Sequence, residues 1–200
     1  MRGSLFALQP VGTPGLIALV VGGLIFFAML VATRVGAGGS GAGDKRSGRS
    51  AAGIFLQMLG FAITGFGPVR ASLPATGAAA LAEAALIAVL MAGSVLLFRS
   101  AARAMGANWS LIARTRADHQ LVTSGVFARI RHPIYTAMAL FLIALAVALG
   151  HEANLLLGVP LFVIGTWIRV REEEKLLRAQ FGDAYERYAT SVKRFVPGLL

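Results

Sequence analysis

Five apolar runs dominate the pattern of hydrophobic and polar positions along the chain. They cover residues 16–32, 51–67, 77–98, 133–149 and 155–168. A helix needs about 20 residues to cross a hydrocarbon core of roughly 30 Å, so each run predicts a transmembrane helix. The fifth run is too short to span on its own and must continue into the charged sequence from Arg169 to about Gln180.

The connections between the runs predict how the helices follow one another. Only residues 150–154 separate the fourth run from the fifth, which predicts a helical hairpin. Residues 36–50 are rich in Gly and Ser and predict a flexible loop, and Pro68 and Pro74 frame a predicted turn. Residues 99–132 form the longest polar and basic segment.

Both ends of the chain carry further predictions. Gly182 is expected just past the end of the fifth helix, where glycine is favoured. A last short helix then contains Tyr185 and Tyr188 and ends before Pro197. For the first apolar run a cleaved signal peptide is the alternative, but its basic region would be Arg2 alone and no small-residue cleavage site directly follows.

Composition and charge agree with a membrane location. Hydrophobic residues make up 56% of the chain and charged residues 14%, against about a quarter charged in soluble domains. The mean hydropathy is +0.72. A net charge of +10 could indicate nucleic-acid binding, but the basic residues lie between the apolar runs, so no nucleic-acid partner is expected.

The basic residues also predict an orientation. Five spans place Arg2 and Arg70 on one side of the membrane and the other seventeen Lys and Arg residues on the opposite side. The positive-inside rule then puts the N-terminus outside and the C-terminus in the cytoplasm. An Ala-, Gly- and Arg-rich chain without Cys is typical of bacteria, so the expected location is a bacterial inner membrane.

Several kinds of chemistry are excluded or disfavoured. The absence of Cys excludes disulfides, thiolate nucleophiles and Cys-based metal sites. Only three His occur, and none has a second His or a carboxylate three or four residues later, so no metal is expected. The glycine cluster at residues 38–43 follows an apolar run, but no βαβ unit surrounds it, so it predicts a linker.

Glu83 is the one charged residue inside the third apolar run. At about 1.5 Å per residue it lies roughly 9 Å from the predicted helix start. An intramembrane carboxylate indicates a functional site, for example the proton site of a small transporter. A glutamate less than two turns from a helix end also reaches the membrane interface, and the sequence leaves both interpretations open.

Polar residues gather at the two ends of the predicted hairpin. They occupy residues 119–122, 125–127, 131–135 and 169–174. Because proline suits the first helical turn, His132 is predicted at the N-cap before Pro133, beside unpaired backbone N–H groups. Such a helix end favours an anion, for example a carboxylate. The alternative is that Arg131 contacts lipid phosphate and His132 only caps the helix.

Arg169 and Glu173 lie four residues apart and therefore on one face of the fifth helix. A surface ion pair is the simplest interpretation. However, residues 172–174 are three successive carboxylates at a membrane edge, which is costly unless a cation is bound there.

The ordered motifs at these positions resemble the isoprenylcysteine carboxyl methyltransferase family. They read His119-Gln120-Leu121-Val122, Gly125-Val126-Phe127, Arg131-His132-Pro133-Ile134-Tyr135, the run from Arg169 to Glu174, and Phe181-Gly182-Asp183-Ala184-Tyr185. The wider superfamily includes phosphatidylethanolamine N-methyltransferases. The similarity covers about residues 106–197, whereas the first three apolar runs match only in hydropathy.

The resemblance implies an S-adenosylmethionine site, with S-adenosylhomocysteine as product, formed by the C-terminal half. The implied cofactor-binding residues are His119, Gln120, Leu121, Val122, Phe127, His132, Pro133, Ile134, Tyr135 and Glu173. Phe127 stands where the family usually has Tyr, so a hydroxyl contact is lost. Glu173 would pair with the ammonium of the methionine moiety, and Arg169 would bind the methyl acceptor as the catalytic and substrate-binding residue.

The expected fold is an all-α integral membrane protein with five transmembrane helices, the last two a helical hairpin, and a cytoplasmic cofactor pocket formed by the C-terminal half. Residues 1–98 are expected to be a scaffold with possible acceptor access, and residues 99–200 the methyltransferase core. The expected activity is methyl transfer to a lipophilic or lipid-linked acceptor, with a carboxylate favoured because Arg169 can hold it bidentately. The alternatives are a phospholipid amine acceptor, a non-catalytic membrane bundle and a small transporter.

Overall fold

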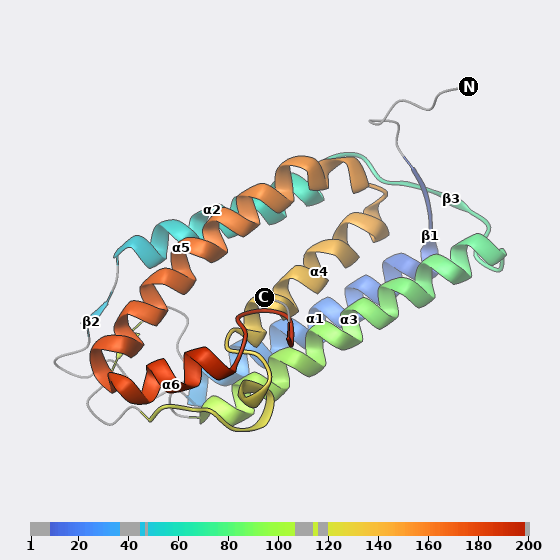
Figure 1. Cartoon of the computed structure of the whole chain (residues 1–200). Coiled ribbons are helices and arrows are strands. Elements are labelled where there is room, and N and C mark those ends of the chain that lie inside the picture. The colour runs from blue at the N-terminus through green and yellow to red at the C-terminus, as the bar shows by residue number, and fades with distance from the viewer. Residues whose placement is uncertain (1–8, 37–44, 47, 107–113, 116–119, 199–200) are drawn as a thin grey trace.

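Helices make up most of the chain. The computed structural model describes residues 9–36, 45–46, 48–106, 114–115 and 120–198. The helices are α1 (Thr13–Gly36), α2 (Gly48–Gly65), α3 (Ala78–Met105), α4 (Pro133–Leu149), α5 (Leu155–Phe181) and α6 (Asp183–Ser191) (Figure 1). The sequence predicted each of these helices, and the bounds of α4 agree with the prediction at both ends.

The described part of the chain is mostly helical, as expected, and short extended segments accompany the helices. The strands are β1 (Pro10–Gly12), β2 (Lys45–Arg46), β3 (Arg70–Leu73) and β4 (Arg114–Thr115), and the short 3-10 helices are η2 (Gly125–Ala128) and η3 (Glu152–Asn154). β1 pairs in parallel with β3, and β2 pairs antiparallel with β4. The turn predicted between Pro68 and Pro74 contains β3, because pairing with β1 satisfies backbone groups where both segments leave the bundle.

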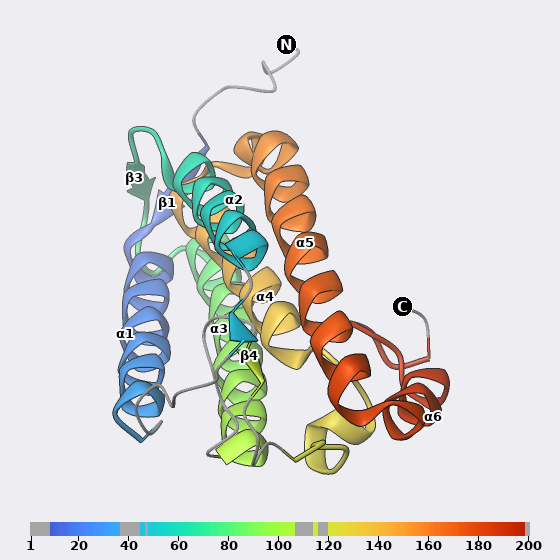
Figure 2. The same ribbon diagram turned by 90° about the vertical axis from the view of Figure 1, so that its left-hand side faces the viewer.

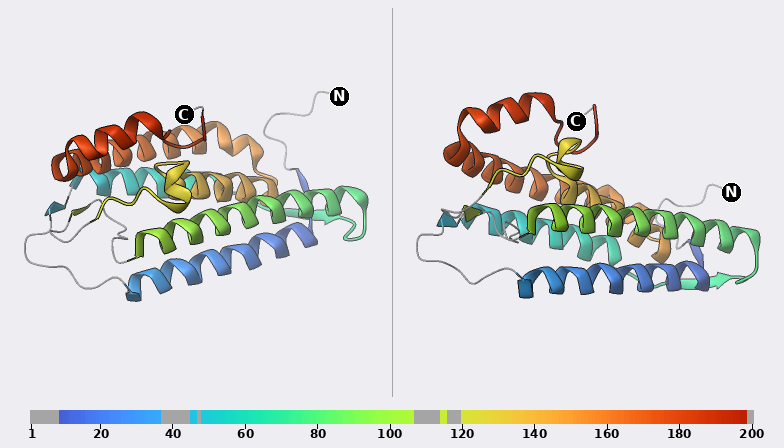
Figure 3. Two further views of the ribbon diagram at one scale, coloured as in Figure 1. Left: turned by 60° about the horizontal axis from the view of Figure 1, so that its bottom comes forward. Right: turned by 90° about the horizontal axis from the view of Figure 1, so that it is seen from below.

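Five long helices lie side by side, with α4 between the pair α1 and α3 and the pair α2 and α5 (Figures 1 and 2). Figure 3 shows from two further sides that α1 and α3 run alongside each other. β1, β3 and the α4–α5 connection lie at one end of the bundle, and α6 lies at the other (Figure 2). The described residues of the polar segment 120–132 and the charged C-terminal residues 169–196 therefore lie at the same end of the bundle (Figure 2).

The helical bundle is an integral membrane domain. Helix α1, helix α3 and the segment Glu152–Phe181 are long and apolar enough to cross a membrane, while α4 is a shorter apolar helix. Large apolar side chains face outward on four helices, among them Phe27, Phe55, Val89 and Leu157, each more than 60% exposed. An exposed apolar surface of this extent fits a lipid environment. The count of five spans stays a prediction. Helices α2 and α4, which would be the second and fourth spans, pack alongside the other long helices (Figures 1 and 2).

The local sequence accounts for where helices α5 and α3 end. Helix α5 ends at Phe181, and Gly182 follows with φ of 49°, a backbone conformation that favours glycine. Helix α3 continues to Met105 rather than ending at residue 98. Its extra turns contain three alanines, which are strong helix formers, whereas hydropathy reports only where the apolar run ends.

Small side chains on α4 let the neighbouring helices approach closely. Ala137, Ala144 and Ala148 are fully buried in the two apolar clusters that α4 forms with α1 and α3. In one cluster the rings of Phe26 and Phe98 lie 4.7 Å apart. The hydroxyl of Ser94 on α3 donates to the carbonyl oxygen of Ala137 at 2.8 Å, which adds a polar contact between α3 and α4.

Glycines bring α2 and α5 together. A Cβ atom on Gly165 would lie 2.6 Å from the carbonyl oxygen of Gly53, and a Cβ atom on Gly60 would lie 2.7 Å from that of Gly158. Close backbone approach of this kind is a general way of packing membrane helices. Between the two crossings the amide of Gln57 donates to the hydroxyl of Thr166 on α5 at 2.8 Å.

Glu83 lies beside the start of α1. One of its oxygens accepts a hydrogen bond from the backbone N–H of Gly12 at 3.1 Å. A helix N-terminus carries partial positive charge and unpaired N–H groups, so the carboxylate stabilises the start of α1. This position is at the end of the bundle opposite α6. Of the two interpretations left open by the sequence, the contact favours a structural role near the membrane interface.

The close approach of α2 and α5 makes Gly165 sensitive to substitution. We expect Gly165→Ala to destabilise the protein by about 1–3 kcal/mol, because the added methyl group meets backbone atoms that side-chain motion cannot clear. Thermal unfolding in one detergent measures the effect. The matched control is Gly23→Ala on α1, where the nearest atom lies 3.6 Å away. Equal unfolding temperatures for the two variants would contradict the packing described.

Candidate functional site

Polar side chains from four segments converge at the end of the bundle that carries α6. The segments are the start of α4, the C-terminal half of α5, α6 and residues 192–196, called here the C-terminal strap. His132 is the N-cap of α4 as predicted, with Pro133 in the first turn, although its side chain makes no capping hydrogen bond. Its ring turns instead toward α5.

The first group of contacts, the tyrosine network, joins Tyr135, Arg169, Glu173 and His132. The hydroxyl of Tyr135 donates to a carboxylate oxygen of Glu173 and accepts a hydrogen bond from Nε of Arg169 at 2.8 Å. Nη2 of Arg169 lies 3.5 Å from Glu173, so the predicted i,i+4 pair exists. Both partners are shielded, with side chains 9% and 24% exposed, so this pair is part of a buried network rather than a surface pair.

The second group, the glutamate cluster, surrounds Glu174, whose side chain is only 2% exposed. Nη1 of Arg131 lies 3.1 Å from one oxygen of Glu174, and Nη1 of Arg178 lies 3.3 Å from the other. Arg194 donates to both oxygens, at 2.9 and 2.8 Å. Nε2 of His132 is 3.3 Å away. A buried carboxylate is stable only with such partners.

The C-terminal strap lies along the start of α4. The backbone N–H groups of Arg131 and His132 donate to the carbonyl oxygens of Lys193 and Arg194, both at 2.9 Å. The hydroxyl of Thr136 donates to the carbonyl oxygen of Phe195 at 3.0 Å. These bonds satisfy N–H groups that a helix start leaves unpaired, and they bring Arg194 to Glu174.

The surroundings shift the ionisation of two groups outside the spans. Burial lowers the pKa of His132, but hydrogen bonds and charges of Glu173 and Glu174 outweigh burial and leave the pKa raised. Burial, followed by the charge of Glu174, raises the pKa of Tyr185 to about 12. His132 therefore favours its protonated form, in which both ring nitrogens donate, and Tyr185 stays neutral.

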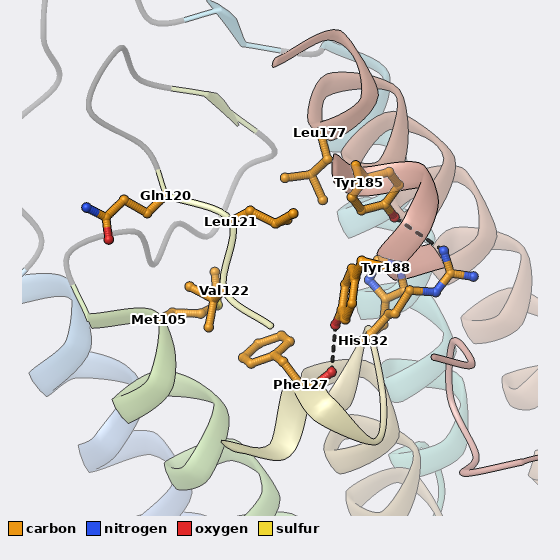
Figure 4. Close-up of a pocket in the computed structure, with 10 residues that line it drawn as sticks. Met105, Gln120, Leu121, Val122, Phe127, His132, Leu177, Tyr185 and Tyr188 are labelled. Carbon is orange, nitrogen blue, oxygen red and sulfur yellow. Dashed lines mark hydrogen bonds between the residues drawn. The ribbon is translucent and has the colours of Figure 1, made fainter. Parts of the chain in front are cut away.

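A small pocket of about 70 Å³ lies next to the glutamate cluster (Figure 4). Its lining comprises Met105, Gln120, Leu121, Val122, Phe127, Arg131, His132, Leu177, Tyr185 and Tyr188. Most of this lining is apolar. Nε of Arg131 is buried and has no hydrogen-bond partner among the described residues. In Figure 4 the hydroxyl of Tyr188 reaches the carbonyl oxygen of Phe127, a hydrogen bond of 2.7 Å that closes one side.

The structure brings most predicted cofactor residues to this region. Gln120, Leu121, Val122, Phe127 and His132 line the pocket, while Tyr135 and Glu173 belong to the tyrosine network, together with Arg169, the predicted acceptor-binding residue. Pro133 is buried in the first turn of α4, and Ile134 packs against the cluster of Phe26 and Phe98. Both therefore position α4. His119 lies outside the described residues.

The sequence does not predict the glutamate cluster. It shows Glu174 only as part of the carboxylate run, and for Arg131 it offers contact with lipid phosphate as an alternative. The Arg131 side chain is 8% exposed and binds Glu174 instead. The cost of three adjacent carboxylates at a membrane edge was the available signal, since it demanded cations, but nothing in the spacing indicates Arg194, twenty residues later. The described residues contain no group of His, Cys, Asp and Glu that could hold a metal ion.

Comparison with known families gives a match to the part of the chain that contains most of these contacts. The model of the phospholipid methyltransferase family matches residues 83–184. This chain belongs to the phospholipid methyltransferase family. The match covers α4, α5, most of α3 and the start of α6, and so includes both groups of polar contacts except the C-terminal strap.

Curated relatives of this family member carry a more specific name. The protein-S-isoprenylcysteine O-methyltransferase of Schizosaccharomyces pombe is 33% identical over 89 residues, which cover 42% of this chain and 36% of that protein. The one of Tribolium castaneum is 29% identical over 117 residues, covering 56% and 40%. The resemblance stated from the motifs is therefore confirmed at the level of the family.

A solved structure is similar as well. The eukaryotic intramembrane Ras methyltransferase ICMT, solved without a monobody, aligns with 78% of this chain and 54% of its own, at 22% identity and a TM-score of 0.45. The chain spans between 36% and 40% of the length of the two curated relatives described above.

Titration of the tyrosines tests the surroundings of Tyr185. We expect the phenol of Tyr185 to ionise near pH 12 in the folded protein, whereas an unfolded chain ionises near pH 10. The stability that the neutral phenol contributes is present below pH 10 and is lost as the pH rises through about 12. Phenolate absorbance of the wild type minus that of Tyr185→Phe measures this midpoint. A difference titration centred near pH 10 would show that Tyr185 is not shielded.

Proposed function

We propose that this chain is an integral-membrane methyltransferase that moves a methyl group from S-adenosylmethionine to a hydrophobic acceptor. The observation that carries the proposal is the convergence of His132, Tyr135, Arg169 and Glu173 beside a pocket lined by residues 120–122 and Phe127, in a member of the phospholipid methyltransferase family. Residues 99–200 would form the catalytic core, and residues 1–98 a scaffold with possible acceptor access.

The lining of the pocket fits a cofactor that is part apolar and part polar. Apolar side chains such as Val122, Phe127 and Leu177 would pack against a ring, and Nε of Arg131, buried without a described partner, would donate to an acceptor atom. A volume of about 70 Å³ is below the roughly 300–1,000 Å³ of typical ligand sites, so this pocket would take one part of the cofactor. Glu173 would hold the ammonium group of the methionine moiety.

Methyl transfer requires mainly that the donor methyl group and the acceptor are held in the right geometry. The cofactor supplies a methyl group on a sulfonium, which is open to in-line displacement without a metal or a covalent intermediate. The residues of the chain would hold the acceptor oxygen in line and exclude water. Arg169 is suited to the first task, because a guanidinium binds a carboxylate bidentately and Tyr135 fixes its orientation through Nε.

The charge of the site favours an anionic acceptor. The two groups of contacts contain four arginines and His132 but only two glutamates, so positive charge is in excess. An ionised carboxylate would be attracted, whereas a protonated amine would be repelled. We therefore favour the carboxylate of an isoprenylcysteine-like or other lipophilic compound. A phospholipid amine is the second candidate, because the matching family is described as phospholipid methyltransferases.

The arrangement in the membrane follows from the charge pattern. We propose five spans with the N-terminus outside and the site on the cytoplasmic face, where seventeen of the nineteen Lys and Arg residues would lie. Cofactor would then enter from the cytoplasm, and a lipophilic acceptor from the bilayer. A bacterial inner membrane is the proposed location.

Cofactor binding tests the proposed function directly. We expect purified wild-type protein to bind S-adenosylhomocysteine in calorimetry, and Glu173→Ala and His132→Ala each to weaken binding about tenfold or more, since each removes a charged hydrogen-bonding partner. Glu186→Ala, which removes an exposed carboxylate on α6, is the matched control and should bind as wild type does. A folded wild type without affinity would leave the non-catalytic membrane bundle as the better account.

Acceptor preference tests the role of Arg169. We expect Arg169→Ala to lower kcat/KM for a lipophilic carboxylate about a hundredfold, because it removes the group that holds the reacting oxygen, and to affect an amine acceptor much less. Arg171→Ala on the exposed face of the same helix is the control. Equal losses for both acceptors would argue against a carboxylate-binding role.

A further inference from the structure

Glu174 is not explained by the proposed roles of the site. It does not line the pocket, and its oxygens contact Arg131 before α4 and Arg194 of the C-terminal strap. Burying a carboxylate carries a desolvation penalty, which only well-placed charged or hydrogen-bonding partners offset. Three arginines already contact its two oxygens, and Arg194 does so as a bidentate pair, so the additional contact with His132 links Glu174 to the rest of the site rather than only compensating its charge.

The ring of His132 links Glu174 to Glu173. Its Nε2 lies 3.3 Å from an oxygen of Glu174, and its Nδ1 lies 3.5 Å from an oxygen of Glu173. Because the imidazole ring is rigid, holding one nitrogen fixes the direction of the other. Only the protonated ring can donate to both carboxylates, since a neutral ring has one donor and one acceptor.

We propose that Glu174 is a positioning residue, which holds the ring of His132 in its doubly donating form and so fixes the carboxylate of Glu173 for the cofactor. This inference rests on the proposed function, in which Glu173 meets the ammonium group. Glu174 itself acts through His132 and touches no substrate. The His132 side chain is only 6% exposed, so its two carboxylate contacts are shielded from bulk solvent.

A purely structural role is the alternative. In that case Glu174 would only bind Arg194 and keep the C-terminal strap in place. The protonation of the His132 ring would then not depend on Glu174. The two roles differ in one observable, the protonation of His132. Charged and titratable groups from the segments packed around that ring contact it, contact one of its two carboxylate partners or line the pocket beside it. They are Arg131, Tyr135, Arg169, Glu173, Glu174, Arg178, Tyr185 and Arg194.

The ¹⁵N signals of the His132 ring measure that protonation without any ligand. The chain has three His residues, so His132→Gln assigns the signals by subtraction. In the wild type we expect both ring nitrogens to be protonated and the titration midpoint to lie above the ordinary value of about 6.5. In Glu174→Gln burial remains while the carboxylate is lost, so we expect the midpoint to fall by about one pH unit or more.

Affinity for S-adenosylhomocysteine gives the second measurement. We expect Glu174→Gln to weaken binding about tenfold, and Glu174→Asp, which keeps the charge, to restore part of the loss. Glu186→Gln is the control, because Glu186 also pairs with Arg178 but is 53% exposed and distant from His132 in the network. It should leave both the midpoint and the affinity unchanged.

Arg194→Gln keeps the inference testable if Glu174→Gln does not fold. This variant keeps the carboxylate but removes its strongest competing partner, so the His132 midpoint should hold or rise. A fall in Arg194→Gln would overturn the inference. A neutral His132 ring in the wild type, or a Glu174→Gln variant with unchanged midpoint and affinity, would overturn it too. A wild type that binds no S-adenosylhomocysteine but titrates as expected would instead count against the proposed function.

Discussion

The arrangement of the bundle end that carries α6 depends on the ion pairs of the buried Glu174 carboxylate. Its two oxygens receive side chains from the segment before α4, from α5 itself and from the C-terminal strap. Removing Arg194, which binds both oxygens, would leave the shielded carboxylate less well compensated. The position of His132, and through it the tyrosine network, therefore depends on contacts between segments that are far apart in the sequence.

Close helix packing in the rest of the bundle positions the residues at this end. Alanines on α4 and glycines on α2 and α5 allow close backbone approach, so α4 is held between two helix pairs. Within the lipid there is no hydrophobic gain from association, and close packing of this kind is what holds helices together. As a result Tyr135 and Arg169, on different helices, meet with a hydrogen bond of 2.8 Å.

The sequence predicted the parts of this architecture that are local. Pro133 and Gly182 indicated where α4 begins and α5 ends, and the four-residue spacing of Arg169 and Glu173 indicated their pairing. Contacts between distant segments could not be found in this way, because no spacing rule links residue 10 to residue 70 or residue 174 to residue 194. Helix pairing was equally hidden, since hydropathy shows which side chains avoid water and not which helix faces which.

The C-terminal strap has a consequence for the order of biogenesis. A chain is synthesised from its N-terminus, so residues 192–196 are added only after α4 and α5 have been made. Until then the N–H groups of Arg131 and His132 lack the carbonyl oxygens that later accept from them, and Glu174 lacks the guanidinium of Arg194. The polar end of the bundle therefore reaches its final arrangement last, only after the strap has left the ribosome and folded back.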